Sequence, residues 1–129
     1  MISSAEEFVR LRESGDPEEY GRAAWSEAPI EVWRDVIARF PEMRFWVAQN
    51  KSVPLEILRD LAVDEDAGVR WMVAARRKLD RPLFELLLRD SDHGVIDRLV
   101  VNTKAPADIR DAAREKLAAL RAAYAADTE

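Results

Sequence analysis

The chain has 129 residues, a formal net charge of −5, no cysteine, and 48% hydrophobic against 35% charged residues. This balance predicts one ordered domain rather than a disordered segment. The lack of cysteine excludes disulfides and thiolate metal sites, and it fits a reducing compartment without proving one. We expect no secretory signal at the N-terminus and no membrane span, because no apolar run nears the ~20 residues that cross a bilayer. A cytoplasmic protein is the simplest expectation.

The charge is unevenly distributed along the chain. Residues 1–42 carry 10 acidic and 5 basic side chains, whereas residues 43–104 carry 10 acidic and 11 basic ones. A protein that binds nucleic acid generally needs clustered Lys and Arg to contact phosphates. An acidic N-terminal part beside a neutral middle therefore argues against general affinity for nucleic acid.

The first 42 residues predict three helices. Ser4 and Glu7 form a capping box for the first, and Asp16 followed by proline begins the second. Pro29 opens the third helix and Pro41 ends it, with apolar residues at helical spacing between them. The expected helices cover about residues 5–14, 17–27 and 30–40.

One sequence phrase is repeated with a spacing of 26 residues, as DEDAGVR at 64–70 and DSDHGVI at 90–96. Apolar residues follow the same spacing on one side of a predicted helix, where they should be buried. A fixed period of this length indicates a stacked repeat protein. The three recurring positions are Met43, Val69 and Val95; Val47, Val73 and Leu99; and Ala48, Ala74 and Val100.

Each repeat should contain two helices. The first ends at Asn50, Arg76 or Asn102, and after a turn the second begins near Pro54, Pro82 or Pro106. Pro82 comes two places late, which predicts a longer turn at residues 78–80. Residues 20–37 fit the same scheme with one residue fewer. The sequence therefore predicts about four helix pairs and, because no segment alternates with a period of two, an all-α fold without a sheet.

The last predicted helix is longer, from Pro106 to about residue 125, with residues 126–129 expected to fray. One side should pack on the stack and the other should face water, as in the terminal cap of a repeat array. The residues of the expected buried stripe are Ile109, Ala113, Leu117, Leu120 and Tyr124.

The repeat resembles a known class. The pattern Val-Arg-x-x-Val-Ala, then Pro, then Leu-x-x-Leu-Ala-x-Asp-x-Asp resembles HEAT-like repeats, closest to the short bacterial kind called the leucine-rich repeat variant. The best copy is residues 44–68, and the match covers roughly 43–117. The resemblance implies an all-α, right-handed α-solenoid that binds other macromolecules. It implies one domain, 1–129, with capping helices and a degenerate repeat at 1–42, repeats at 43–105 and a capping helix at 106–126.

Two further features of that class bear on this chain. A founding member of the variant family carries a cysteine-bound iron–sulfur cluster, which a chain without cysteine cannot hold, so we expect no cofactor. HEAT-like stacks also carry a ladder of Asp and Arg from neighbouring repeats. The resemblance assigns that role to Asp66, Arg44 and Arg70, and the ladder should end where Ile96 replaces the next arginine.

An aromatic patch is the main candidate for a partner-binding site. Its residues are Phe45, Trp46, Trp71 and Met72, with Gln49 one turn further along and Tyr20 as the counterpart in the first pair. In the following copy the equivalent positions are Asp97 and Arg98, and charges there indicate sites that are not deeply buried. Exposed apolar clusters of this kind mark binding surfaces. The competing interpretation is that Trp25, Trp33 and the N-terminal helices cover the patch as core.

A basic cluster is the second candidate, for an anionic partner such as nucleic acid. It contains Arg70, Arg76, Arg77, Lys78 and Arg81. The competing interpretation is a solvated turn, because bases are favoured near the C-terminal end of a helix in any case.

Other motifs favour structural readings. The two Asp-x-Asp-x-Gly segments lack the remaining ligands of a calcium loop, so Asp66 and Asp92 are expected to cap helices. Gly68 would be required in its turn only if the backbone there has positive φ. His93 is the only histidine, and no nucleophile pairs with it in a recognisable pattern. We therefore expect no metal site.

The leading hypothesis is a non-enzymatic protein-binding repeat module, more simply a monomer, with an immunity- or antitoxin-like inhibitory role by analogy with similar small bacterial repeat proteins. The alternative is a nucleic-acid-binding HEAT-like module that uses the basic cluster at 70–89. A hydrolase or transferase is the third hypothesis, and it would require a deep cleft with carboxylates of raised pKa.

Overall fold

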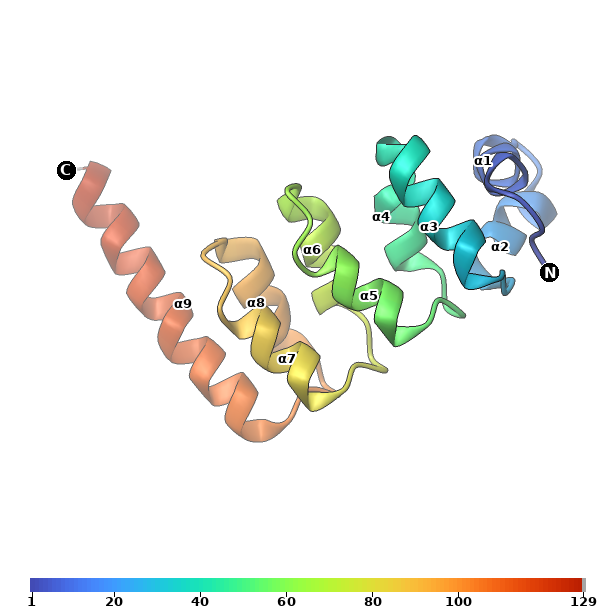
Figure 1. Cartoon of the computed structure of the whole chain (residues 1–129). Helices are drawn as coiled ribbons and strands as arrows, with labels where there is room; N and C mark the ends of the chain where they lie inside the picture. Colours follow the sequence, from blue (N-terminus) through green and yellow to red (C-terminus); the bar gives the residue numbers. More distant parts are fainter. Residues whose placement is uncertain (129) are drawn as a thin grey trace. The chain divides into compact units, whose positions relative to one another are not determined.

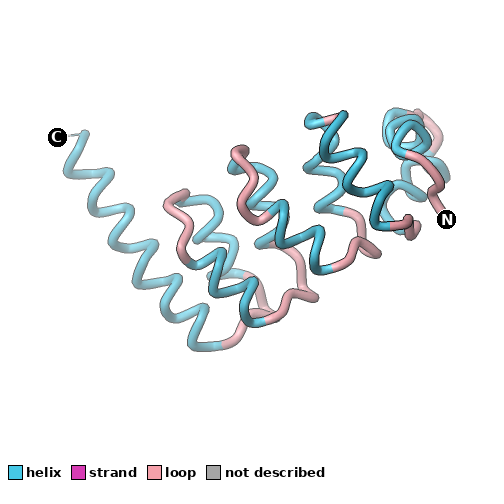
Figure 2. Tube along the Cα trace, viewed as in Figure 1, coloured by secondary structure: helices cyan, strands magenta, loops and turns pink. Residues whose placement is uncertain are grey.

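The computed structural model describes residues 1–128, and over that range it is all-helical with no strand (Figure 2). This confirms the predicted all-α class. Most of the predicted helix boundaries lie within two residues of those in the structure. The helices are α1 (Ala5–Glu13), α2 (Pro17–Trp25), α3 (Ile30–Arg39), a 3₁₀ turn η1 (Pro41–Met43), α4 (Arg44–Gln49), α5 (Leu55–Leu61), α6 (Ala67–Ala74), α7 (Arg81–Leu88), α8 (His93–Val101) and α9 (Ala107–Thr128).

The helix starts follow the capping residues predicted from the sequence. The Ser4 side chain accepts a hydrogen bond from the Glu7 backbone N–H at 3.0 Å. The carboxylates of Asp66 and Asp92 cap α6 and α8 in the same way. Each of these side chains satisfies a backbone donor that the helix itself leaves without a partner. The repeated acidic phrase is therefore a capping motif.

The glycine of the first copy of that phrase, Gly68, lies beside the capping side chain. Among the described residues no glycine has positive φ, and Gly68 lies within the first turn of α6. A Cβ atom at Gly68 would stand 3.1 Å from the Asp66 Oδ1 atom that accepts its N–H. The condition of positive φ is therefore not met, and the lack of a side chain at Gly68 instead leaves room for the capping carboxylate.

The chain divides into two compact units, residues 1–61 and 62–129. In the first unit α3 contacts both α1 and α5, while α2 contacts α4, so the helices lie in two layers (Figure 1). Contacts of α1 with α2, α3 with α4, and α4 with α5 join the layers. Phe8 and Trp33 meet edge to face at 5.3 Å between α1 and α3, and Trp33 is fully buried.

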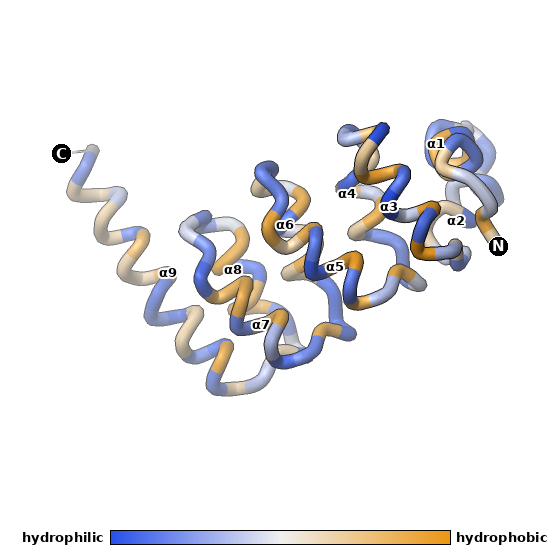
Figure 3. Tube along the Cα trace, viewed as in Figure 1, coloured by the Kyte–Doolittle hydropathy of each residue, from blue (hydrophilic) through white to orange (hydrophobic). Residues whose placement is uncertain are grey.

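The second unit repeats this arrangement. Helix α6 contacts α8 in one layer, α7 contacts α9 in the other, and α8 touches both α7 and α9. The apolar interior comes from one side of every helix, and hydrophobic and hydrophilic residues alternate along each helix in Figure 3. Val73 and Leu99 are 0% exposed, as Val47 is in the first unit. The predicted inward positions are therefore confirmed, except that Val100 is only half-buried.

The long helix α9 departs from its predicted stripe. Ile109, Ala113 and Leu117 are buried, but Leu120 is half-buried and Tyr124 is 65% exposed. The physical reason is length, because α9 has 22 residues whereas α8, its main neighbour, has 9. The last turns of α9 therefore extend past the helix that would cover them. The helix also continues through Thr128, beyond the residue where fraying was expected, and Glu129 lies outside the described residues.

A buried asparagine closes the loop after the first helix of a pair in each unit. The Asn102 side-chain amide donates to the carbonyl oxygens of Ala74 and Arg76 at 2.8 and 2.9 Å, and its Oδ1 accepts from the Lys104 backbone N–H. Asn50 does the same in the first unit, donating to the carbonyls of Ala23 and Ser26. A buried carbonyl without a partner is costly, so these amides tie one helix pair to the loop of the pair before it.

Val73→Asp should prevent folding of the second unit. The substitution places a carboxylate in an apolar interior, at a cost of several kcal/mol against a total stability of about 5–15 kcal/mol. Val101→Asp is the matched control, because Val101 is 48% exposed on α8. Circular dichroism and thermal melting measure both. A cooperative melt of Val73→Asp near the wild-type temperature would contradict the assigned interior.

Asn102→Ala should lower the free energy of unfolding by about 1–3 kcal/mol, because it leaves two buried carbonyls without a donor. Thr103→Ala, at the exposed neighbouring residue, should change it by less than about 0.5 kcal/mol. Urea denaturation of the three proteins measures the difference. Equal midpoints for both variants would show that the amide contributes nothing to linking the helix pairs.

Candidate partner-binding face

One side of α8 forms an exposed stripe in the second unit. Gly94, Asp97 and Val101 are exposed and Arg98 is half-buried, and their spacing of three and four residues places them on one helix face. The opposite side, with Val95 and Leu99, is fully buried. Packing therefore fixes the direction of the helix and leaves this stripe facing outward.

Trp71 of α6 lies along one edge of the stripe. The Arg98 guanidinium stands 5.4 Å from the centroid of the Trp71 ring, and a Cβ atom at Gly94 would be 3.8 Å from Trp71 Cδ1. Trp71 remains 37% exposed. A guanidinium over an indole face is a favourable cation–π arrangement. It also holds the arginine and the tryptophan beside one another at the surface.

Tyr124 of α9 lies along the other side. Its ring meets His93 edge to face at 5.9 Å, and one turn earlier Arg121 lies 3.9 Å from a carboxylate oxygen of Asp97. We call this surface the α6–α8–α9 face. Its residues are Trp71, His93, Gly94, Asp97, Arg98, Val101, Arg121 and Tyr124. It combines aromatic and aliphatic area with charge on three helices that contact one another through α8.

The predicted aromatic patch is divided between the two units. Trp71 and Met72 belong to α6, and Met72 is half-buried beside the exposed Trp71. Phe45 and Trp46 belong to α4 of the first unit, where both are half-buried and their rings meet edge to face at 4.9 Å. Of the four residues, only Trp71 belongs to the α6–α8–α9 face.

The N-terminal helices cover only part of the first-unit pair. The Arg12 guanidinium of α1 stacks 3.4 Å from the centroid of the Trp46 ring, which covers one face of that indole. Of the tryptophans expected to act as a cover, Trp33 is buried in the core but Trp25 is 66% exposed. Tyr20 is 42% exposed and Gln49 is half-buried.

The residues of the basic cluster have different environments. Arg70 makes a part-buried ion pair with Asp90 at 2.7 Å and donates to the backbone carbonyls of Asp64 and Glu65. The hydrogen bond to Asp90 raises the pKa of Arg70. The carboxylate that Arg70 contacts is thus Asp90, whereas the carboxylate of Asp66 caps α6.

The other residues of the basic cluster also differ in burial and in their contacts. Arg76 is buried, and this burial lowers the pKa of its guanidinium. Arg81 pairs with Glu85 at 2.9 Å and with Asp108 of α9, and these hydrogen bonds raise the pKa of Arg81. Only Arg77 and Lys78 of the five are exposed and have no polar side-chain contact within the described part of the chain. The structure therefore does not gather the cluster into one open basic surface.

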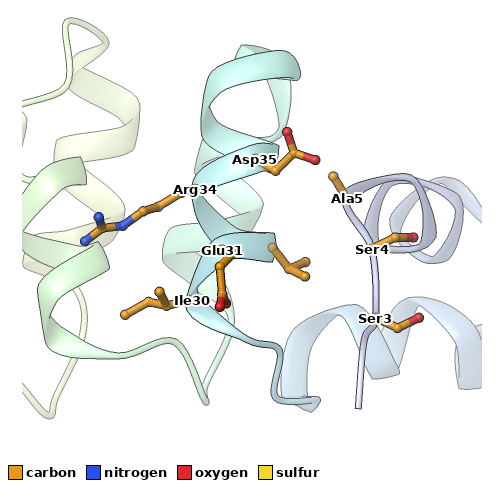
Figure 4. A pocket seen from close by; sticks show the side chains of 8 residues that line it. Ser3, Ser4, Ala5, Ile30, Glu31, Arg34 and Asp35 are labelled. Carbon is orange, nitrogen blue, oxygen red and sulfur yellow. The ribbon is translucent and has the colours of Figure 1, made fainter.

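A shallow groove lies in the first unit between residues 3–5 and α3 (Figure 4). Three of its polar side chains have partners within the unit: Ser3 donates to Glu7, Arg34 pairs with Glu56, and Asp35 pairs with Arg39. The hydrogen bond from Arg39 lowers the pKa of Asp35. A carboxyl group of lowered pKa is a poor general acid near neutral pH.

No group of three or more His, Cys, Asp or Glu side chains that could hold a metal ion occurs within residues 1–128. Over the same range no helix combines the length and the apolar character needed to cross a membrane.

No protein-family model matches the chain. No curated protein and no solved structure matches it either. The family resemblance therefore stays a prediction, and a functional assignment depends on the geometry of the molecule.

Sequence reasoning missed part of the face. The apolar stripe of α9 predicts an interior position for Tyr124, and the charge of Arg98 predicts only that its site is exposed. The excess length of α9 over the preceding helices could have indicated that its last turns lack a neighbour. The stacking of Arg98 on Trp71 gives no signal in the sequence, since it depends on how α6 and α8 are placed.

Proposed function

We propose that this protein is a non-enzymatic protein-binding module that engages its partner through the α6–α8–α9 face. The observation that carries the proposal is Trp71, which is 37% exposed although it sits on a helix whose other large apolar side chains are buried or half-buried. Val101 and Tyr124 add exposed apolar area on the two neighbouring helices, at 48% and 65%. Such a cluster is costly in water unless a partner covers it.

The composition of the face supports a protein rather than a small molecule as the ligand. Tryptophan, tyrosine and arginine are the residues that contribute most to the affinity of protein interfaces. Here Trp71, Arg98 and Tyr124 occur together with the charged pair Asp97 and Arg121, so that apolar area lies beside polar groups. Protein interfaces have this arrangement of anchors within a polar rim.

The proposed architecture is one continuous right-handed α-solenoid of HEAT-like repeats, closest to the leucine-rich repeat variant. Within each unit, first helices contact first helices and second helices contact second helices, which supports the stacking. The sequence period of 26 residues runs through both units. The handedness comes from the resemblance. An inhibitory, immunity-like role and a monomeric state remain part of this proposal by analogy.

Photo-crosslinking tests the proposed face directly. A photoreactive phenylalanine analogue placed at position 71 and expressed in the native host should give one dominant crosslinked partner, because that side chain is exposed within the face. The same analogue at Glu85, exposed on α7 of the same unit, is the matched control. Mass spectrometry identifies the product and should find the partner only with position 71.

Two outcomes would contradict the proposal. A partner captured equally from positions 71 and 85 would mean that the face is not selective. A folded double variant, Trp71→Ala with Tyr124→Ala, that still recovers the partner in full would mean that these aromatic side chains contribute nothing to binding.

The alternative, nucleic-acid binding, is favoured by one observation, the exposure of Arg77 and Lys78. We expect no binding of a fluorescent DNA or RNA duplex at micromolar protein in low salt, because Arg70 and Arg81 are held in ion pairs and cannot contribute free charge. Fluorescence anisotropy measures this. A steep loss of affinity with added salt, abolished by Arg77→Ala with Lys78→Ala, would favour the alternative instead.

A further inference from the structure

We propose that Arg98, stacked beside Trp71, binds a carboxylate of the partner, so that the segment recognised by this face is acidic with an apolar residue next to the acid. This inference rests on the proposed function and specifies the chemistry of its partner. Most arginines of the second unit already have hydrogen-bond or ion-pair acceptors.

Arg98 differs from its neighbours in having a half-buried guanidinium without an acceptor. Arg70, Arg114 and Arg121 pair with carboxylates, and so does Arg81. Arg110 donates to a backbone carbonyl of α8. Arg98 makes no hydrogen bond or ion pair with any residue that the structure describes, and its Nε atom is buried without a partner. Its adjacent acid, Asp97, is directed to Arg121 instead.

The stack on Trp71 holds this guanidinium in place. Arginine loses side-chain freedom when it binds an anion, and stacking on an aromatic face removes part of that cost beforehand. Among the described residues no carboxylate forms an ion pair with this guanidinium. A carboxylate that approaches its N–H groups would form charge-assisted hydrogen bonds, which are the stronger kind.

The surroundings of Arg98 favour a protein segment over a phosphate backbone. Asp97 lies next to it on the exposed stripe, and a nearby negative charge disfavours a polyanion more than a single carboxylate. Gly94 presents no side chain to the Trp71 ring, which leaves that edge of the ring for the apolar neighbour of the acid. The charge and the apolar contact together describe an acidic-hydrophobic peptide.

Arg12 also stacks on a tryptophan, but in a contact that differs from that of Arg98. Its guanidinium lies 3.4 Å from the Trp46 centroid and joins α1 to α4, and Trp46 is half-buried beneath it. That contact serves the packing of the first unit. The Trp71 ring, in contrast, stays more than a third exposed beside Arg98, so both members of the pair remain open to a ligand.

Selection from a phage-displayed library of random dodecapeptides tests the inference on the full chain. We expect the wild-type protein to enrich peptides with Asp or Glu next to an aromatic or aliphatic residue. A selected peptide should bind Arg98→Gln about tenfold or more weakly in calorimetric titrations, because the charge-assisted contact is lost. Arg89→Gln, the matched control, removes an exposed arginine at the end of α7 and should bind like wild type.

The same titrations separate the possible failures. Replacing the peptide's acid by its amide should reproduce the loss without any change in the protein, which keeps the test valid if Arg98→Gln folds poorly. Peptides enriched without an acidic residue, or bound equally by Arg98→Gln, would overturn the inference and leave the protein-binding function standing. No enrichment by the wild-type protein would count against both. Weaker binding by Arg98→Lys than by wild type would further support recognition by the planar guanidinium.

Discussion

The buried amides of Asn50 and Asn102 are the contacts on which the linking of helix pairs depends. Short helices leave carbonyl groups without partners at every loop, and a stacked arrangement would bury these groups between pairs. Asn102 bonds two carbonyls at the end of α6 while its own oxygen holds the following turn. One side chain therefore provides donors for the loop carbonyls of one helix pair and an acceptor for the turn that leads to the next helix. Arg76, which is also buried, stands 26 residues from each asparagine in the sequence.

That constraint determines which surfaces stay open. With both ends of α8 fixed, by the Asp92 cap and by Asn102, its inward side must carry Val95 and Leu99 and its outward side must carry Gly94, Asp97, Arg98 and Val101. Helix α9 begins beside the Asn102 loop and, with 22 residues against 9, is much longer than α8. It extends past α8, and the Tyr124 ring reaches the start of that helix at His93.

Most of the fold could be predicted from the sequence, because the residues that determine it act locally. Capping residues such as Ser4, Asp66 and Asp92 set where helices begin, and the period of 26 identified Val47, Val73 and Leu99 as interior. Less of the candidate site could be predicted, because its contacts join residues on different helices. The ion pair of Arg70 with Asp90 spans 20 residues, and the repeat period does not show which carboxylate an arginine contacts. The amide contacts of Asn102 were hidden for the same reason, although its position at a helix end was predicted.

The contrast between inward and outward positions bears on function. At the inward position the repeats carry Val47, Val73 and Leu99, which differ little because the same apolar space must be filled each time. At the outward positions the equivalent residues are Phe45, Trp71 and Asp97, followed by Trp46, Met72 and Arg98, which differ in size and charge. Packing cannot require a tryptophan in one copy and an aspartate in the next. Residues chosen for packing alone would also not leave an indole and an acceptor-free guanidinium side by side at the surface. This contrast between uniform inward and varied outward positions supports the proposal that the α6–α8–α9 face binds a partner.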